Sequence, residues 1–273
     1  MIQYQTERVT VFESQLFKTT STVVETADCI LVVDPTWLPA EIKEIQNFVE
    51  QRRHNRPLYL LFTHSDYDHI LGYGAFPDAK VIASRAFTEH PDPESVLSQI
   101  RTFDDFYYVD RSYDLVYPNV DIIAEDTQSL QIGETKLSFY TAPGHTKDGI
   151  FTIVEPVGIF IAGDYLSDIE FPYIYDSSTT YLQTLHKAKE ILKKHKISLL
   201  VAGHGHVTTE QVAMTARISE AERYILNLRQ AIIEQQSTEA NSFIGHYRYL
   251  QSMKDYHEAN VTCLKNELGI TSK

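Results

Sequence analysis

Short segments of alternating or consecutive apolar residues recur along the chain and are typical of β-strands. Residues 7–34 contain three of them, VTVFES, STVVET and CILVVD, all rich in β-branched side chains. Comparable segments follow later in the chain: LYLLF, KVIAS, VDIIAE, TKLSFYTA, IFTIVE, VGIFIAG and ISLLVAG. The pattern predicts many short strands, grouped in two halves of the chain.

Between and after these strands, apolar residues recur at helical spacing. A first helix is predicted from about Pro39, because proline is tolerated in a first turn and the apolar residues that follow lie on one face. A second helix precedes ISLLVAG and is predicted to open on a capping box formed by Thr180 and Gln183. Most of the chain after residue 207 is predicted to be helical.

Two strand-rich halves, each accompanied by helices, indicate an α/β protein in which two sheets pack face to face and helices cover the outside. The chain of 273 residues is long enough for one large core, and no low-complexity linker divides it. We therefore expect a single domain over residues 1–273, with a core of about residues 7–206 and a helical C-terminal extension over 207–273.

The composition is that of an ordinary globular protein, with 43% hydrophobic and 22% charged residues. The formal net charge of -13 and the lack of a run of lysine and arginine argue against a nucleic-acid partner, because such a surface repels phosphate backbones. No segment approaches the roughly 20 apolar residues of a membrane span, so we expect a cytoplasmic protein without membrane contacts. Cys29 and Cys263 are too isolated to indicate a disulfide framework or a thiolate metal site.

A dense cluster of metal-ligand side chains follows the LYLLF strand. The segment THSDYDH holds four of them, His64, Asp66, Asp68 and His69. Imidazole and carboxylate ligands suit zinc, iron, manganese and cobalt, and so tight a cluster could hardly be buried without cations to neutralise it. The structural alternative is a solvated acidic turn.

Three later strand-like segments also end on a ligand-type residue beside glycine: His145 in APGHT, Asp164 in IAGDY and His204 in VAGHG. Strand-end loops can bring distant residues to one edge of a sheet, and glycine lets the backbone approach a metal closely. The recurrence predicts that all four segments contribute to one metal site.

In the order of these motifs the sequence resembles the metallo-β-lactamase superfamily. The signature of that family is an early Asp, then His-x-His-x-Asp-His, then separate His, Asp and His residues at later strand ends. The resemblance spans residues 34–204 and implies an αββα four-layer sandwich with two divalent metal ions. It also implies that Asp34, in VVDPTW, braces the metal loop without binding metal. The implied ligands are His64, Asp66 and His145 for one metal, Asp68, His69 and His204 for the other, and Asp164 as a bridge between both.

Asp66 departs from the commonest pattern of the superfamily, which has a second histidine at this position. A carboxylate is a harder ligand than imidazole and shifts the metal preference toward iron or manganese, although zinc is still expected first. In this respect the sequence resembles the flavodiiron proteins, which have Glu at this place, and the competence-type nucleases, which have Asp.

Two adjacent cations could lower the pKa of a shared water enough to supply hydroxide, and could stabilise the oxyanion that forms on attack. We therefore expect an enzyme that hydrolyses an ester, lactone, thioester or phosphodiester in a small molecule, with Asp68 and Asp164 also guiding the proton. Tyr67 and Tyr165 are candidate hydrogen-bond donors to the substrate. The alternatives are an iron-dependent redox enzyme with a flavodiiron-like site and a nuclease. The helical extension after residue 207 is a candidate contact for a homodimer.

Overall fold

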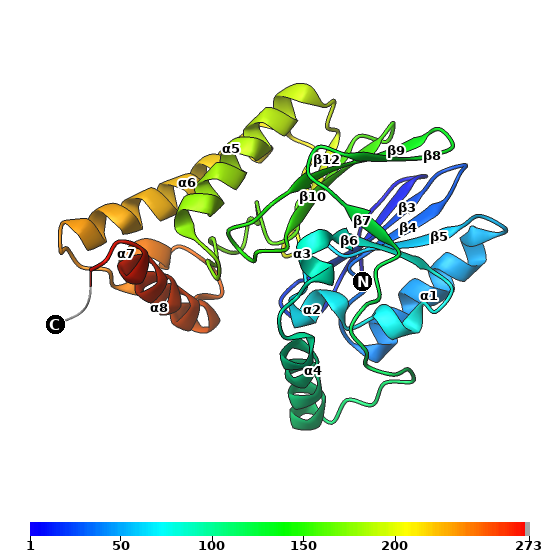
Figure 1. Ribbon diagram of the computed structural model, residues 1–273, viewed down its shortest axis with the longest axis horizontal. Coiled ribbons are helices and arrows are strands. Elements are labelled where there is room, and N and C mark those ends of the chain that lie inside the picture. Colours follow the sequence, from blue (N-terminus) through cyan, green and yellow to red (C-terminus); the bar gives the residue numbers. More distant parts are fainter. Residues whose placement is uncertain (271–273) are drawn as a thin grey trace.

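Two β-sheets lie face to face at the centre of the computed structural model, which describes residues 1–270 (Figure 1). The larger sheet has its strands in chain order; neighbouring strands are antiparallel from β1 to β4 and parallel from β4 to β7. These strands are β1 (Ile2–Gln5), β2 (Val9–Glu13), β3 (Thr20–Glu25), β4 (Ile30–Val33), β5 (Leu58–Leu61), β6 (Lys80–Ser84) and β7 (Ile122–Ala124).

The smaller sheet has the strand order β12-β11-β10-β9-β8. Its pairs are antiparallel except for β11 with β12, which is parallel. The strands are β8 (Ser129–Ile132), β9 (Thr135–Thr141), β10 (Ile150–Glu155), β11 (Ile159–Ile161) and β12 (Leu199–Val201). Because β9 and β11 are both antiparallel to β10, the strands β9, β11 and β12 all run in the same direction.

Helices cover the outer face of each sheet (Figure 1). The helices that follow strands of the larger sheet are α1 (Pro39–Arg53), α2 (Tyr67–Ile70), the short 3-10 helix η1 (Tyr73–Ala75), α3 (Arg85–Thr88) and α4 (Pro93–Tyr107). The helices of the second half are α5 (Ser178–Lys194), α6 (Gln211–Ile233), α7 (Ala240–Ile244) and α8 (Leu250–Glu267).

Three apolar layers hold the sheets and helices together. Side chains such as Leu31 and Phe139 fill the space between the two sheets. Ile45 of α1 packs with the outer side chains of the larger sheet, and Leu185 of α5 packs with those of the smaller sheet. Each layer removes apolar surface from water, which is the main driving force for this arrangement. The predicted α/β fold, an αββα four-layer sandwich, is confirmed.

Two strands of the structure were not predicted from the apolar pattern, and both lie at sheet edges. In β1 and β8 no residue is fully buried. Edge strands pack fewer side chains against the core, so their hydrophobic signal is weak. The predicted start of α5 is also corrected: Ser177 is the N-cap, because its Oγ accepts a hydrogen bond from the backbone N–H of Thr180 (3.2 Å).

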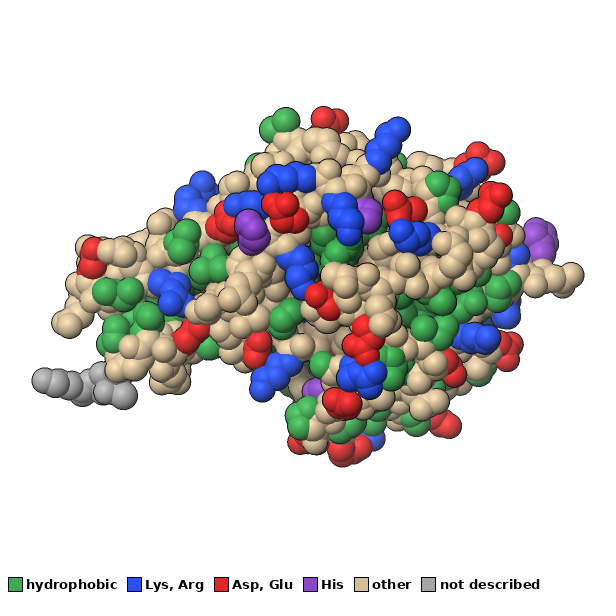
Figure 2. Space-filling model, turned by 45° about the horizontal axis from the view of Figure 1, so that its top comes forward, with side chains coloured by type: hydrophobic (Ala, Val, Ile, Leu, Met, Phe, Trp, Pro, Cys, Tyr) green, Lys and Arg blue, Asp and Glu red, His purple; other side chains and the backbone are tan. Residues whose placement is uncertain are grey.

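The chain after residue 207 forms α6, α7 and α8, which extend to one side of the sandwich (Figure 1). α6 packs against α5, and α8 packs against α6. The end of the predicted extension, residues 271–273, lies outside the described part of the chain. No helix within residues 1–270 is long and apolar enough to cross a membrane. On the face shown in Figure 2, basic and acidic side chains are interspersed and form no continuous basic patch.

Glu267, the last residue of α8, fastens this helix to the N-terminus of α5. Its carboxylate accepts hydrogen bonds from the Ser177 hydroxyl (2.9 Å), from the backbone N–H groups of Ser178 and Thr179 (3.2 Å each) and from the Ser178 hydroxyl. Burial alone would raise the pKa of Glu267, but these hydrogen bonds outweigh it and lower the pKa to about 2. The positive end of the α5 dipole acts in the same direction. The contact is therefore strong only while Glu267 is ionised.

We expect Glu267→Gln to lower the free energy of unfolding by about 1–2 kcal/mol at neutral pH, because the amide carries no charge and accepts weaker hydrogen bonds. Since the folded-state pKa lies below the ordinary value of 4.5, the stabilisation is complete above that pH and is lost as the pH falls through about 2. Urea unfolding at neutral pH and at about pH 2 measures both effects. Glu258→Gln, which neutralises an exposed acid on the same helix, is the control. Equal losses in the two variants would contradict this role of Glu267.

Candidate metal centre

Five strands end at the same edge of the sandwich, and each is followed by a predicted functional residue. β4 and β5 run parallel in the larger sheet, while β9, β11 and β12 share one direction in the smaller sheet. Their carboxyl ends therefore meet across the interface between the sheets. The residues that follow them are Asp34 after β4, His64 to His69 after β5, His145 after β9, Asp164 after β11 and His204 after β12.

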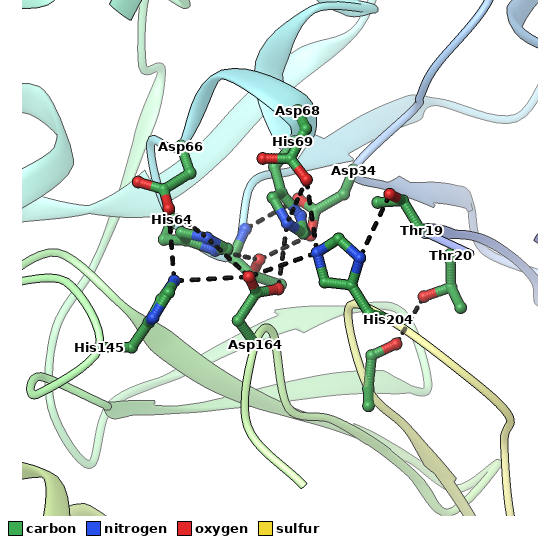
Figure 3. Close-up of polar contacts among 12 residues, drawn as sticks. Thr19, Thr20, Asp34, His64, Asp66, Asp68, His69, His145, Asp164 and His204 are labelled. Carbon is green, nitrogen blue, oxygen red and sulfur yellow. Dashed lines mark hydrogen bonds and ion pairs between the residues drawn. The ribbon is translucent and has the colours of Figure 1, made fainter. Parts of the chain in front are cut away.

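One side of the centre is formed by His64, Asp66 and His145 (Figure 3). Asp66 Oδ2 lies 3.7 Å from His64 Nε2 and 3.3 Å from His145 Nε2. With Asp164, these residues offer four ligand atoms that all lie within 4.8 Å of one another. Asp66 thus points into the cluster, beside the Nε2 atoms of two histidines.

The other side is formed by Asp68, His69 and His204, whose ligand atoms also lie within 4.8 Å of one another. Asp68 Oδ2 lies 3.6 Å from His69 Nε2 and 3.3 Å from His204 Nε2. The short helix α2 carries Asp68 and His69 at adjacent positions. Thr36 fixes this turn, because its hydroxyl donates to the backbone carbonyl of Asp68 (2.6 Å).

Asp164 lies between the two sides (Figure 3). Its Oδ1 is 3.1 Å from His69 Nε2, and its Oδ2 is 3.4 Å from both His145 Nε2 and His204 Nε2. Oδ2 is also 3.7 Å from His64 Nε2. The carboxylate therefore faces all four imidazoles, as a residue that bridges two metal ions must.

The protein fixes the orientation of the imidazole rings through their Nδ1 atoms. His145 Nδ1 donates to the carbonyl of Tyr173 (2.8 Å), and His204 Nδ1 donates to the carbonyl of Phe17 (2.9 Å). A carbonyl only accepts, so in both rings Nδ1 carries a proton and Nε2 faces the centre, where it can bind a metal ion once it has lost its own proton. Metal-binding histidines are commonly held in this way.

Asp34 helps to orient the other two rings, those of His64 and His69. It accepts hydrogen bonds from the Thr63 backbone N–H (2.9 Å) and hydroxyl (2.6 Å), and from His69 Nδ1 (3.0 Å). Because the Thr63 proton is donated to Asp34, the Thr63 oxygen accepts from His64 Nδ1 (3.0 Å). Asp34 therefore lies behind the cluster and braces it through these contacts.

The buried Nε2 atoms show that the centre suits cations. Among residues 1–270, Nε2 of His64, His69 and His145 is buried without a hydrogen-bond partner, and so is Oδ1 of Asp164. Buried polar atoms normally have a partner, so a group of buried nitrogen and oxygen atoms that face one place without partners indicates a site for a bound ligand. A divalent metal ion meets that requirement.

The charges of the centre lead to the same conclusion. Burial alone would lower the pKa of His145, but Asp164 and Asp66 outweigh it and raise the pKa to about 10. Burial would raise the pKa of Asp66 and of Asp164, yet the neighbouring histidines hold both well below their usual range. Without metal, the carboxylates therefore draw protons onto the imidazoles, and metal ions would compete for the same positions.

Gly203 is required for the close packing around Asp164. A Cβ atom at this position would lie 2.1 Å from Asp164 Oδ1 and 3.0 Å from His69 Cε1. Both distances are shorter than normal contacts, so a side chain here would displace the Asp164 carboxylate. A specific contact therefore accounts for glycine at this position of the VAGHG segment.

The two tyrosines predicted to contact substrate occupy different environments. Tyr67 lines the cavity over the cluster. Tyr165 is 2% exposed; its hydroxyl donates to the Pro143 carbonyl (2.8 Å) and accepts from the His145 backbone N–H (3.0 Å). Tyr165 thus positions His145, and its hydroxyl is already engaged by the protein.

His206, two residues after His204, does not join the cluster but pairs with Asp168 (2.9 Å) at the surface.

A cavity opens over the cluster, and we call it the substrate cavity. Outside the metal ligands, its lining consists of Phe17, Tyr67, Glu170, Tyr173, Tyr175, Ser252 and Tyr256. Of these residues only Tyr67 was predicted, since single aromatic residues in loops and helices carry no motif. The aromatic segment FPYIY over residues 171–175 was the available signal, and α8 supplies the last two residues. A larger cavity of about 530 Å³ between α6 and α7 contains none of the clustered histidines and aspartates.

Comparisons with known proteins bear on both the fold and the motifs. The family model described as the metallo-beta-lactamase superfamily matches residues 15–204. A metallo-beta-lactamase type 2 from Bacillus sp. (strain 170) is 24% identical over 200 residues, which cover 72% of this chain and 70% of that protein.

Solved structures show the same fold at low sequence identity. A metallo-beta-lactamase family protein from Thermus thermophilus has a TM-score of 0.68 and 15% identity, covering 97% of this chain and 95% of that one. The sec-alkylsulfatase Pisa1 from Pseudomonas sp. has a TM-score of 0.69 and 12% identity, covering 98% of this chain and 50% of that one. Such low identities establish the architecture and leave the substrate open.

Proposed function

Since the chain belongs to the metallo-β-lactamase superfamily, whose members are mostly metal-dependent hydrolases, we propose that it is a binuclear metal-dependent hydrolase. Its substrate would be a small molecule with an ester, lactone, thioester or phosphodiester bond. The observation that supports this most directly is the set of four imidazoles whose Nδ1 atoms are bound by the protein and whose Nε2 atoms face Asp164. Histidines that bind a metal through Nε2 are commonly oriented in this way.

Two groups of ligands would hold the metals. His64, Asp66 and His145 would bind one, Asp68, His69 and His204 the other, and Asp164 would bridge them. When bound, two divalent ions lower the pKa of water and withdraw electrons from the bond to be cleaved.

The protein itself would orient the water and move its proton. Asp68 borders the substrate cavity, and its side chain is 13% exposed. A carboxylate in that place can accept a proton from the attacking water and pass it to the leaving group. Asp164 is more deeply placed and would serve mainly to keep the two sites together. Tyr67, on the same wall, is positioned to donate a hydrogen bond to the substrate.

Asp66 should set the metal preference. We expect Asp66→His to retain two metals but to bind zinc more tightly relative to manganese and iron, by about tenfold, because imidazole is the softer ligand. Competition between zinc and manganese, followed by elemental analysis of wild-type and variant protein, measures this ratio. An unchanged ratio would show that Asp66 does not coordinate metal.

The test of the proposed function combines metal analysis with a substrate panel. Purified protein is analysed for bound metal and assayed on small esters, lactones, thioesters and phosphodiesters, with and without added zinc or manganese. About two metal ions per chain together with metal-dependent turnover of any panel member would support the proposal. Protein that binds no metal, or that binds iron and hydrolyses nothing on the panel, would overturn it.

A further inference from the structure

The substrate cavity has an unusual charge distribution for a site that is open to solvent. Outside the metal ligands, its lining within residues 1–270 contains five aromatic rings and one carboxylate, Glu170, but no lysine or arginine. Lys18 is paired with Glu13 (2.6 Å) and Arg217 with Asp168 (3.7 Å), and Arg248, which lies close enough to Lys18 to affect its pKa, does not belong to the lining. An anionic group on the distant part of a substrate would therefore meet no basic side chain among these lining residues.

Glu170 lies in the cavity without a basic partner among the described residues. Its backbone N–H donates to Ser167 Oγ (3.1 Å), which fixes the turn that carries it. Its side chain lines the cavity together with Asp68, Asp164 and His204. No lysine or arginine belongs to the lining, so a cation placed beside the ionised carboxylate would be stabilised.

The aromatic rings form a rigid wall next to this carboxylate. The rings of Tyr173 and Tyr256 are stacked, with their centroids 4.3 Å apart and an interplanar angle of 12°. Buried Asn260 joins the two segments that carry them: its Oδ1 accepts from the Ile174 N–H (2.9 Å), and its Nδ2 donates to the Pro172 carbonyl (2.7 Å). The wall is therefore held in place before any ligand arrives.

We propose that the substrate cavity selects substrates that carry a compact cationic group, a quaternary or protonated ammonium, on the part remote from the bond that is cleaved. Glu170 supplies the opposite charge, and the rings of Tyr173, Tyr175 and Tyr256 supply the aromatic surface that ammonium groups favour. The inference rests on the proposed function in one respect, since it takes this cavity to be the place where substrate binds. It goes further by naming the charge of the substrate.

The test uses two small alcohols of nearly equal shape, choline and 3,3-dimethylbutan-1-ol, which differ in the charge of one central atom. 3-Hydroxypropane-1-sulfonate serves as the anionic counterpart. Binding of each to zinc-supplemented protein is measured by isothermal titration calorimetry, so no turnover is needed. We expect choline to bind about tenfold more tightly than the neutral alcohol, and the sulfonate more weakly than choline.

Two pairs of variants assign the effect to the proposed groups. Glu170→Gln should reduce the preference for choline over the neutral alcohol about tenfold, whereas Glu44→Gln, which removes an exposed charge on α1, should leave it unchanged. Tyr256→Leu should weaken choline binding, and Tyr256→Phe, which keeps the ring, should preserve it.

Equal binding of choline and its neutral counterpart, or a preference for choline that Glu170→Gln leaves undiminished, would overturn the inference. These outcomes are separate from those of the hydrolase test. A protein that prefers choline but hydrolyses nothing would contradict the proposed function alone, and a hydrolase without this preference would contradict the charge selectivity alone.

Discussion

Asp164→Ala is expected to abolish both metal binding and hydrolysis, with a loss of activity of at least about 1,000-fold. The Asp164 carboxylate faces all four imidazoles, with oxygen-to-Nε2 distances between 3.1 and 3.7 Å. Without this carboxylate, each group of three ligands would lose the oxygen donor that the two groups share. Elemental analysis of the purified variant and its activity on the best panel substrate measure the effect.

Two further variants distinguish the loss of the shared ligand from the loss of a ligand on one side and from a change outside the site. His145→Ala removes a ligand from one side only, so we expect it to lose that ion first and to retain part of the other. His186→Ala, an exposed histidine on α5, should leave both metal content and activity unchanged. A normal content of two metals in Asp164→Ala would show that the bridge has been assigned to the wrong residue.

Asp34→Ala is expected to have the second largest effect, although Asp34 is not among the proposed metal ligands. Its carboxylate accepts three hydrogen bonds, from Thr63 and from His69 Nδ1, and it is 2% exposed. The loss would leave buried donors unpaired, which costs about 3 kcal/mol of unfolding free energy, and would weaken metal affinity about 10–100-fold. Chemical denaturation and metal titration measure the two quantities.

Asp34→Asn separates the positioning of His69 from simple stability. Asparagine tolerates the positive φ of 43° at this position and still accepts from the Thr63 N–H, so the fold should lose less stability than in the alanine variant. Its amide, however, cannot accept from His69 Nδ1 in the way a carboxylate oxygen does. The proton of His69 would then shift toward Nε2, the atom that faces the metal. Undiminished metal affinity in Asp34→Asn would contradict this role.

The sequence was most informative where a residue type is chemically demanding. Apolar runs predicted the inner strands, because those strands are buried on both faces, and the ligand-type residues at strand ends predicted which loops meet. The structure brings the seven side chains together, with Asp164 between the other six. Their arrangement in two sides could be anticipated only from the resemblance to a known family, since spacing along the chain does not determine distance in space.

Other features depend on contacts that no local pattern records. The edge strands β1 and β8 contain too few buried residues to be recognised. The N-cap of α5 is Ser177, and its hydroxyl is also bound by Glu267, a residue far along the chain. The wall of the substrate cavity is likewise made by α8 and the 171–175 segment, which become neighbours only through the packing around Asn260.

Each proposed metal ion takes ligands from both sheets: Asp66 or Asp68 with a histidine from the larger sheet, and His145 or His204 from the smaller. The ions would consequently act as cross-links between the two halves of the sandwich. By mass action, each tenfold rise in free metal above the dissociation constant adds about 1.4 kcal/mol per site to the stability of the folded state. The stability of the folded protein would then depend on the metal supply of its surroundings.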